Sequence, residues 1–339
     1  MIVNEWRLRM KDRFIVLACA LIVVLLASLP VAGQAPSAAV RNWTAPRTPD
    51  GQPDLQGIWS NATITPLERP ADLAGKAFLT AEEAAAFEKR AADGRVEADR
   101  PVPGVVGSYN QFWFDAGTEV VSTRQTSLIV DPPDGRLPAL TPEAQKKADA
   151  RAEARRLRPA DGPESRSLAE RCILWGTAGP PMLPSAYNNN FQILQTPGHV
   201  MILNEMIHDA RIIPLDGRPH LPQNIRQWMG DSRGRWEGNT LVIETTNFSE
   251  KTAFRGSSEK LHLVERFTRS SQDTLLYEFT VNDPSSFARP WTVSIPARKA
   301  DGLIYEYACH EGNIGMVGIL GGGRADDKAA EEAAKKRSN

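Results

Sequence analysis

Residues 260–282 read KLHLVERFTRSSQDTLLYEFTVN, and this stretch decides the fold class. Side chains of a β-strand alternate between two faces, so Leu263 and Phe267 share one face, as do Tyr277 and Phe279. The polar run SSQD between the two segments is typical of a turn. The stretch therefore predicts two neighbouring antiparallel strands whose apolar side chains point into a core.

The same alternation of strand and turn signals extends from residue 191 to residue 310. Strands are predicted at 191–196, 199–207, 210–215, 233–237, 240–248, 260–269, 274–282, 290–298 and 303–310. The turns between them carry Pro197-Gly198, Asp216-Gly217, Glu237-Gly238-Asn239, Asp283-Pro284 and Asp301-Gly302. An antiparallel meander of this kind removes its exposed edges by closing into a barrel or rolling into a sandwich. We therefore predict a mainly β fold with a closed or rolled meander.

The first half of the chain has fewer strand signals and more helical ones. Thr80-Ala-Glu-Glu83 is a capping box before an Ala/Glu/Lys-rich run, and Thr141-Pro142 places an N-cap before proline at the first helical position. Helices are predicted at 80–93, 142–157 and 164–174, and short strands at 109–114 and 123–130. We expect this half to form a helical and extended wrap around the sheet.

The N-terminal residues have the pattern of an export signal. Residues 1–13 are polar with a basic excess, residues 14–29 are an unbroken apolar run, and small residues follow Pro30. These three parts predict a secretory signal peptide cleaved near Gly33 to Ala35. Two alternatives stay open, namely an uncleaved membrane anchor and a lipoprotein modified at Cys19. The predicted divisions are a signal peptide at 1–35, a linker at 36–53, the wrap at 54–175, an antiparallel β domain at 176–320 and a flexible tail at 321–339.

Composition limits the class of partner. The chain of 339 residues has 40 Lys and Arg against 41 Asp and Glu. A nucleic-acid-binding protein normally carries a basic excess, so this balance argues against nucleic acid as a partner. Contact with a membrane is expected only through the N-terminal signal segment.

Two cysteines, Cys172 and Cys309, remain after the predicted cleavage. Two thiols in an oxidising compartment usually pair, so we predict a disulfide between them. The alternative is a pair of buried free thiols.

Several longer phrases resemble one family of proteins. They are SLIVDPPDGRLPALTPEAQ at 127–145, HDARIIPLDGRPHLP at 208–222, WEGNTLVIETTNF at 236–248, ERFTR at 265–269 and YEYACHEGN at 305–313. They resemble a family of exported bacterial proteins described mainly as hypothetical proteins of acidobacteria and related bacteria. The resemblance implies export and a shared fold, and it implies no catalytic residue because no activity is established for that family. Separately, Gly57-Ile58-Trp59 resembles the Gly-x-Trp start of calycin barrels, a group that includes the lipocalins.

Three residues are candidates for catalysis. His208 is followed by Asp209, which could orient it as a general base. Glu265 stands on an apolar strand face, where a carboxylate must pair or take a raised pKa; a register bulge would instead make it a surface residue. His310 ends the last predicted strand, which a closed meander brings beside the first. We therefore predict that His208, Glu265 and His310 meet at the mouth of a cavity.

A second set of side chains is predicted to line that cavity and bind a small, partly apolar ligand. It comprises Glu205, Arg211, Trp236, Glu244, Tyr277, Trp291 and Tyr305. The alternatives are that the aromatic residues form core and that Arg211 makes a structural ion pair with Asp216. No His-x-His or His-Glu-x-x-His spacing occurs, so no metal site is predicted, and no motif identifies a cofactor.

These patterns favour an exported, β-rich protein that binds a small ligand. The first alternative is an acid/base or metal-assisted enzyme that uses the cavity histidines and carboxylates. The second is a structural envelope protein whose polar strand residues satisfy one another. An open pocket would favour binding, clustered histidines and carboxylates would favour catalysis, and a filled barrel would favour the structural alternative.

Overall fold

The computed structural model describes residues 43–98, 114–157, 160–252, 254–307, 309 and 313–338. The predicted signal peptide, most of the strand predicted at 109–114 and the candidate residue His310 lie outside these ranges.

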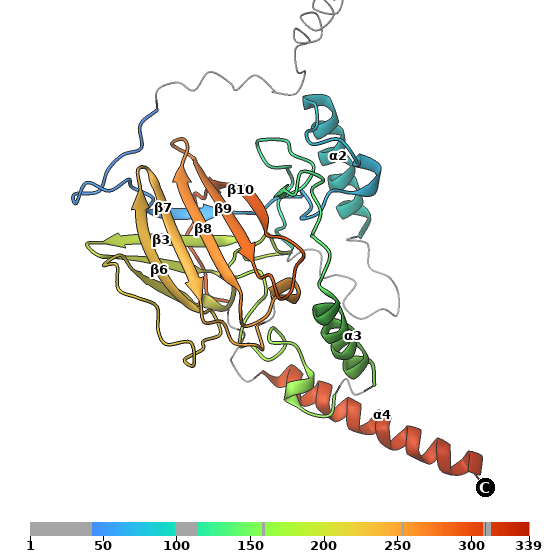
Figure 1. Cartoon of the computed structure of the whole chain (residues 1–339). Helices are drawn as coiled ribbons and strands as arrows, with labels where there is room; N and C mark the ends of the chain where they lie inside the picture. The colour runs from blue at the N-terminus through green and yellow to red at the C-terminus, as the bar shows by residue number, and fades with distance from the viewer. Residues whose placement is uncertain are drawn as a thin grey trace, which may run out of the picture. The chain divides into compact units, whose positions relative to one another are not determined.

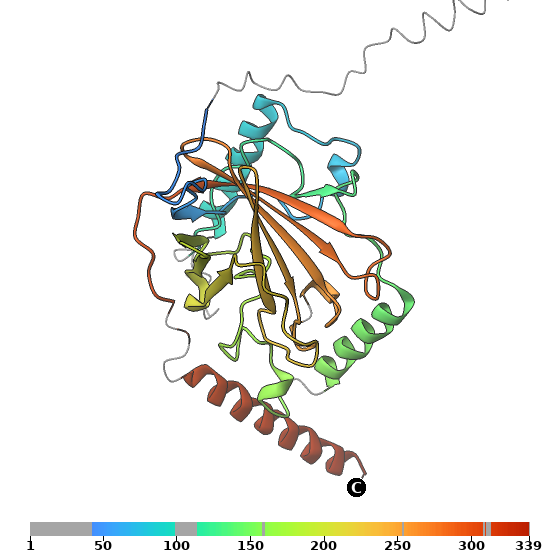
Figure 2. The same ribbon diagram turned by 60° about the vertical axis from the view of Figure 1, so that its left-hand side comes forward.

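Ten antiparallel strands form one sheet in the described residues, in the order β5-β4-β3-β1-β10-β9-β8-β7-β6, with β2 paired to β10. The sheet curves until its two end strands, β5 and β6, lie beside each other (Figure 1 and Figure 2). The strands are β1 (Gly57–Ser60), β2 (Ile129–Asp131), β3 (Asn190–Thr196), β4 (His199–Asn204), β5 (Ala210–Pro214), β6 (Asp231–Glu237), β7 (Thr240–Thr246), β8 (His262–Arg269), β9 (Thr274–Asn282) and β10 (Trp291–Lys299). The predicted mainly β fold is therefore confirmed, and its form is a nearly closed barrel.

The three α-helices described are α2 (Ala81–Ala98), α3 (Pro142–Leu157) and α4 (Ile314–Ser338). At the start of α2 the capping box forms as predicted, because the Glu83 amide donates to Thr80 Oγ1 at 3.2 Å and the Thr80 amide to Glu83 Oε2 at 2.8 Å. The helix predicted at 164–174 is wrong: only a 3₁₀ turn forms, at Pro163–Ser165. Cys172 has a φ of 54°, which a right-handed helix cannot accommodate. No helix in the described ranges is both long and apolar enough to span a membrane.

The barrel interior is filled by the apolar faces that the sequence predicts. Phe267, Tyr277, Phe279 and Trp291 are each at most 1% exposed. The rings of Phe267 and Tyr277 stack with centroids 4.7 Å apart, and those of Phe279 and Trp291 meet edge to face at 6.0 Å. Aromatic pairs in these geometries add to the stability gained from apolar burial. The interior of β8, β9 and β10 is therefore packed core.

Strand β1 joins the two halves of the sheet by lying between β3 and β10, where Trp59 is opposite Phe191 on one side and Lys299 on the other. Trp59 is 0% exposed, and its Nε1 donates to the Leu55 carbonyl at 2.9 Å. The Gly-Ile-Trp segment thus lies in the barrel wall, which is compatible with the resemblance to calycin barrels.

Three predicted strands need correction. The strand predicted at 199–207 ends at Asn204, because the chain turns at Met206–His208, where Ile207 has a φ of 66°. The strand predicted at 303–310 does not form in the residues of that segment that the structure describes. Both edges of β10 are already paired, one with β9 and the other with β1 and β2, so no edge is free for it there. The strand predicted at 123–130 shortens to β2.

Gly234 on β6 faces β5 where the barrel almost closes. A Cβ atom at this position would lie 2.6 Å from Leu215 Cδ2 and 2.9 Å from Ile213 Cγ2, which is closer than real carbon contacts. Glycine therefore lets β6 approach the β5 side chains. We call the β5–β6 junction the seam.

Candidate functional site

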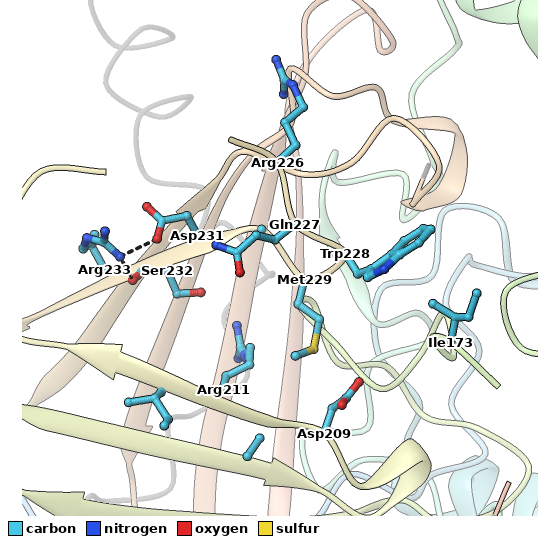
Figure 3. Close-up of a pocket in the computed structure, with 13 residues that line it drawn as sticks. Ile173, Asp209, Arg211, Arg226, Gln227, Trp228, Met229, Asp231, Ser232 and Arg233 are labelled. Atoms are coloured by element: carbon cyan, nitrogen blue, oxygen red, sulfur yellow. Dashed lines mark hydrogen bonds and ion pairs between the residues drawn. The ribbon is translucent and has the colours of Figure 1, made fainter. Parts of the chain in front are cut away.

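A pocket of about 550 Å³ opens at the seam, between the start of β5 and the start of β6. Figure 3 shows its lining side chains, and a pocket of this volume suits a small molecule. The lining residues are Ile173, Asp209, Ala210, Arg211, Ile212, Arg226, Gln227, Trp228, Met229, Gly230, Asp231, Ser232 and Arg233. We call this the seam pocket.

Arg211 connects the seam pocket to the barrel interior. Its side chain is 3% exposed and forms a two-pronged ion pair with Glu265, with Nη1 2.6 Å from Oε2 and Nη2 3.1 Å from Oε1. Glu265 lies on β8 opposite Ile243 and Phe279 and is 0% exposed. The prediction that Glu265 points into the barrel is confirmed, and Arg211 is the partner that allows a carboxylate to be buried there.

Tyr277 extends this network across the core. Its hydroxyl donates to Glu265 Oε1 at 2.7 Å and accepts from the Met182 amide at 3.0 Å. Burial, and then the negative charge of Glu265, raise the pKa of Tyr277 well above its usual value of about 10. Burial acts to lower the pKa of Arg211, but the attraction of Glu265 outweighs it and the net shift is upward. The network therefore holds a cation, an anion and a neutral phenol.

We expect the stability of the protein to fall more steeply at alkaline pH in the wild type than in a Tyr277→Phe variant. Unfolded tyrosine loses its proton near pH 10, whereas folded Tyr277 keeps it, so the contribution of this group is complete below about pH 10 and is lost as the pH rises toward the folded pKa. Urea unfolding at a series of pH values from about 8 to about 11 measures the difference. Tyr305→Phe, at a side chain that is 69% exposed, is the matched control. Parallel pH profiles for all three proteins would contradict this prediction.

One wall of the seam pocket is a loop held by hydrogen bonds to its backbone. The Asn247 amide group donates to the carbonyls of Leu221, Pro222 and Ile225 at 2.9 to 3.1 Å. The Gln227 amide donates to the Asn247 carbonyl at 3.0 Å. Further along, Thr252 Oγ1 donates to the Trp228 carbonyl at 2.9 Å. These bonds fix the wall before any ligand arrives, which lowers the entropy cost of binding.

This wall carries two large apolar side chains, Trp228 and Met229, beside the polar Arg226 and Gln227. Trp228 is 37% exposed, and Met229 and Ile173 lie near it in the pocket (Figure 3). Gln227, on the same wall, extends its side chain toward Arg211 in the same view. Trp228, Met229, Ile173 and Gln227 were not among the predicted ligand residues. An exposed tryptophan in a polar loop between strands was the one local signal that could have pointed to them.

Charged side chains at the β6 end of the pocket already have partners within the protein. Asp231 accepts from Arg233 Nη1 at 2.6 Å and from the Leu221 amide at 3.0 Å, and its Oδ2 is 3.0 Å from His220 Nδ1. Arg226 Nη1 donates to the carbonyls of Phe248 and Glu259 at 3.3 and 2.7 Å. These groups form the rim of the pocket.

The alternative pairing of Arg211 with Asp216 is wrong. Asp216 instead accepts from its neighbour Arg218, whose hydrogen bonds lower the pKa of Asp216 to about 2. Arg211 is on the inward face of β5, whereas Asp216 follows the strand in an exposed turn. Alternation along the strand separates the two side chains.

The structure places the other predicted ligand residues away from the seam pocket. Glu205 is buried and accepts from Asn190 Nδ2 at 3.0 Å and from the Tyr305 amide at 3.2 Å, whereas the Tyr305 side chain is 69% exposed. Glu244 pairs with Arg235 outside the core and lies 3.4 Å from His262 Nε2. Trp236 packs against the core, and Trp291 is 0% exposed within it.

The predicted catalytic set is described only in part. Glu265 is placed as above, His208 ends the turn Met206–His208, and His310 lies outside the described residues. Their meeting at one cavity mouth stays a prediction. Among the residues that the structure describes, no three His, Cys, Asp or Glu side chains are grouped as ligands for a metal ion.

The predicted disulfide is present between Cys172 and Cys309. It lies beside a cluster of rings in which the Tyr187 centroid is 6.1 Å from that of Trp175 and 6.2 Å from that of Tyr307. Disulfides persist in oxidising compartments, so this bond points to such a compartment.

Comparisons with known proteins add no further assignment. No protein-family model, curated protein sequence or solved structure matches the chain. The class that fold and pocket define is a nearly closed antiparallel β-barrel with a ligand-sized pocket at its seam.

Proposed function

We propose that this chain is an exported protein that binds a small, partly apolar molecule in the seam pocket. The observation that carries the proposal is the position of Arg211, a buried cation that lines a pocket of about 550 Å³ beside the exposed Trp228. Ligand pockets commonly combine apolar walls with a few placed polar groups. Barrel proteins also offer their openings and junctions as binding sites, so the fold is compatible with this function.

The seam pocket is a better candidate than the barrel interior that the sequence suggested. Tyr277 and Trp291 pack against other rings with 0% of their surface exposed, so a ligand could reach them only by displacing core side chains. Displacing closely packed core side chains is costly, because a packed interior has few voids to receive them. A preformed pocket at the surface avoids that cost.

Export is proposed on two independent grounds. The first is the apolar run at 14–29, bounded by basic residues and by small residues, which is typical of a secretory signal. The second is the Cys172–Cys309 disulfide. Together they favour the periplasm or the exterior of the cell as the place where the ligand is met.

A structural envelope protein is the second candidate, and one observation favours it. The barrel interior is filled, and a filled barrel needs no ligand to be stable. The two candidates differ in what they predict for Trp228, because ligand binding in the seam pocket depends on its side chain and a filled structural barrel does not.

Native mass spectrometry of the protein purified from the exported fraction of its own cells tests the proposal. We expect a retained small molecule in the wild type and its loss in a Trp228→Ala variant, with affinity for the recovered molecule lowered by about tenfold or more. Tyr305→Ala is the matched control, because it removes an exposed aromatic ring that does not line the pocket. A wild type with no retained molecule would favour the structural candidate, and equal losses in both variants would show that the molecule does not bind in the seam pocket.

A further inference from the structure

One edge of the Arg211 guanidinium is unused. A guanidinium has five N–H groups in a fixed plane, and Glu265 occupies the end of this one through Nη1 and Nη2. The remaining edge begins at Nε, which is buried and has no acceptor among the described residues. A buried donor without an acceptor is costly, and natural structures contain few of them.

The geometry of this edge fits one type of acceptor best. An arginine edge presents two parallel N–H groups, and a carboxylate presents two oxygens at the matching spacing. Because Glu265 fixes the guanidinium and Tyr277 fixes Glu265, the free edge is held in one orientation. Arg211 also stays charged at any physiological pH, so the donor is permanent.

The surroundings of the edge define the rest of the ligand. The seam pocket has an apolar side formed by Met229, Trp228 and Ile173. The side-chain amide of Gln227 faces Arg211 across the pocket (Figure 3). Asp209 also lines the pocket, and this residue has an interaction of its own within the protein. A molecule with an apolar body and one acidic end would place each part against a matching surface.

We propose that the ligand of the seam pocket is a carboxylate with an apolar body, whose carboxylate accepts from the Nε edge of Arg211. Arg211 is then the ligand-binding residue, and Glu265 and Tyr277 are positioning residues that act through it. This inference rests on the proposed function, because it names the chemical class of the molecule that the same pocket takes.

Calorimetry with matched pairs of ligands tests the inference. The probes are arylacetates and medium-chain fatty acids, each compared with its own primary amide, which keeps the body and removes the charge. We expect the wild type to bind the preferred carboxylate roughly 10- to 100-fold more tightly than its amide, as hydrogen bonds to a charged group imply. The Trp228→Ala variant should bind both the carboxylate and its amide more weakly, and this result would locate both ligands in the seam pocket.

The Arg211→Lys variant isolates the guanidinium edge, because lysine keeps the positive charge beside Glu265 but has no second donor edge. We expect the ratio of carboxylate affinity to amide affinity to shrink by about tenfold or more in this variant. If the Arg211→Lys variant does not fold, the double variant Arg211→Met with Glu265→Gln, which removes both charges, is used in its place.

Equal affinity of the wild type for acid and amide would overturn the inference and leave the proposed function standing. If neither series binds and native mass spectrometry finds a retained molecule that is not a carboxylate, the inference is likewise overturned alone. If nothing is bound or retained, both fall.

Discussion

A Glu265→Gln substitution will lower the free energy of unfolding by about 3 to 5 kcal/mol, although it changes a single heavy atom of the side chain. The reason is that a neutral amide at this position leaves the charge of Arg211 buried without a counter-charge, since the Arg211 side chain is 3% exposed. The amide oxygen still accepts from Tyr277, so the loss reports the charge rather than the hydrogen bond. Urea unfolding followed by tryptophan fluorescence measures it.

The double variant Arg211→Met with Glu265→Gln separates the pair from its parts. Replacing both members of a buried ion pair by uncharged groups is often neutral for stability, because the cost of desolvating the two charges disappears with their attraction. We therefore expect the double variant to recover more than half of the stability lost in Glu265→Gln. If the double variant lost as much stability as the single variants Glu265→Gln and Arg211→Met lose when their losses are added, each residue would contribute independently.

Glu244→Gln is the matched control on the neighbouring strand. Glu244 pairs with Arg235, but the side chains are 32% and 51% exposed. Water already solvates an ion pair of this kind, so its removal should cost less than about 1 kcal/mol. A loss comparable to that of Glu265→Gln would mean that burial does not decide the energetics of these pairs.

The sequence predicted which side chains of β8 face the interior because strand alternation is a local property. Glu265 and Phe267 fall on the buried face of β8, and Arg266 falls on the other face, where it pairs with Glu237. The turn at Glu237-Gly238-Asn239 joins β6 to β7 as predicted, with Gly238 at a φ of 61°. A period of two residues and a positive φ can both be inferred from neighbours in the chain.

The seam pocket could not be predicted in the same way. Arg211 and Glu265 are 54 residues apart, and they meet because β1 joins the two halves of the sheet and brings β5 beside β6. Nothing local in the four residues of β1 indicates that it pairs with both β3 and β10. Asp216 is much closer to Arg211 in the chain than Glu265 is, and the sequence therefore suggested Asp216 as a partner of Arg211. That prediction is wrong.

The same long-range pairing explains the missing strand at 303–310. Its alternating tyrosines satisfy the local pattern of a strand, but a strand also needs an unpaired neighbour. Strand β1 pairs with β10 at Arg298 and Lys299, the position that the predicted strand would have needed. The local sequence pattern therefore predicts a strand at 303–310 that has no free strand edge beside β10 to pair with.

Replacing Cys172 and Cys309 together by alanine will lower the free energy of unfolding by about 2 to 4 kcal/mol. The bond joins positions 137 residues apart, so breaking it frees a long loop in the unfolded chain. Cys172 is 3% exposed, and alanine avoids burying a new polar group there. In the folded protein the segment before Cys309 would keep the Tyr305–Glu205 hydrogen bond and the packing of Tyr307 against Trp175. Because the covalent link is lost, we expect hydrogen exchange at 303–307 to be faster in the variant than in the wild type, while exchange in β8 and β9 changes less.

Reductant provides the control for this experiment. Dithiothreitol should lower the stability of the wild type to about that of the double alanine variant and leave the variant itself unchanged, because only the wild type has the bond to lose. Thiol labelling of unreduced, denatured protein should find Cys172 and Cys309 blocked. If both were labelled, the disulfide would not form in the cell, and the argument from it to an oxidising compartment would fail. The N-terminal sequence would then be the sole ground for export, and the ligand of the seam pocket would have to be sought inside the cell as well as outside it.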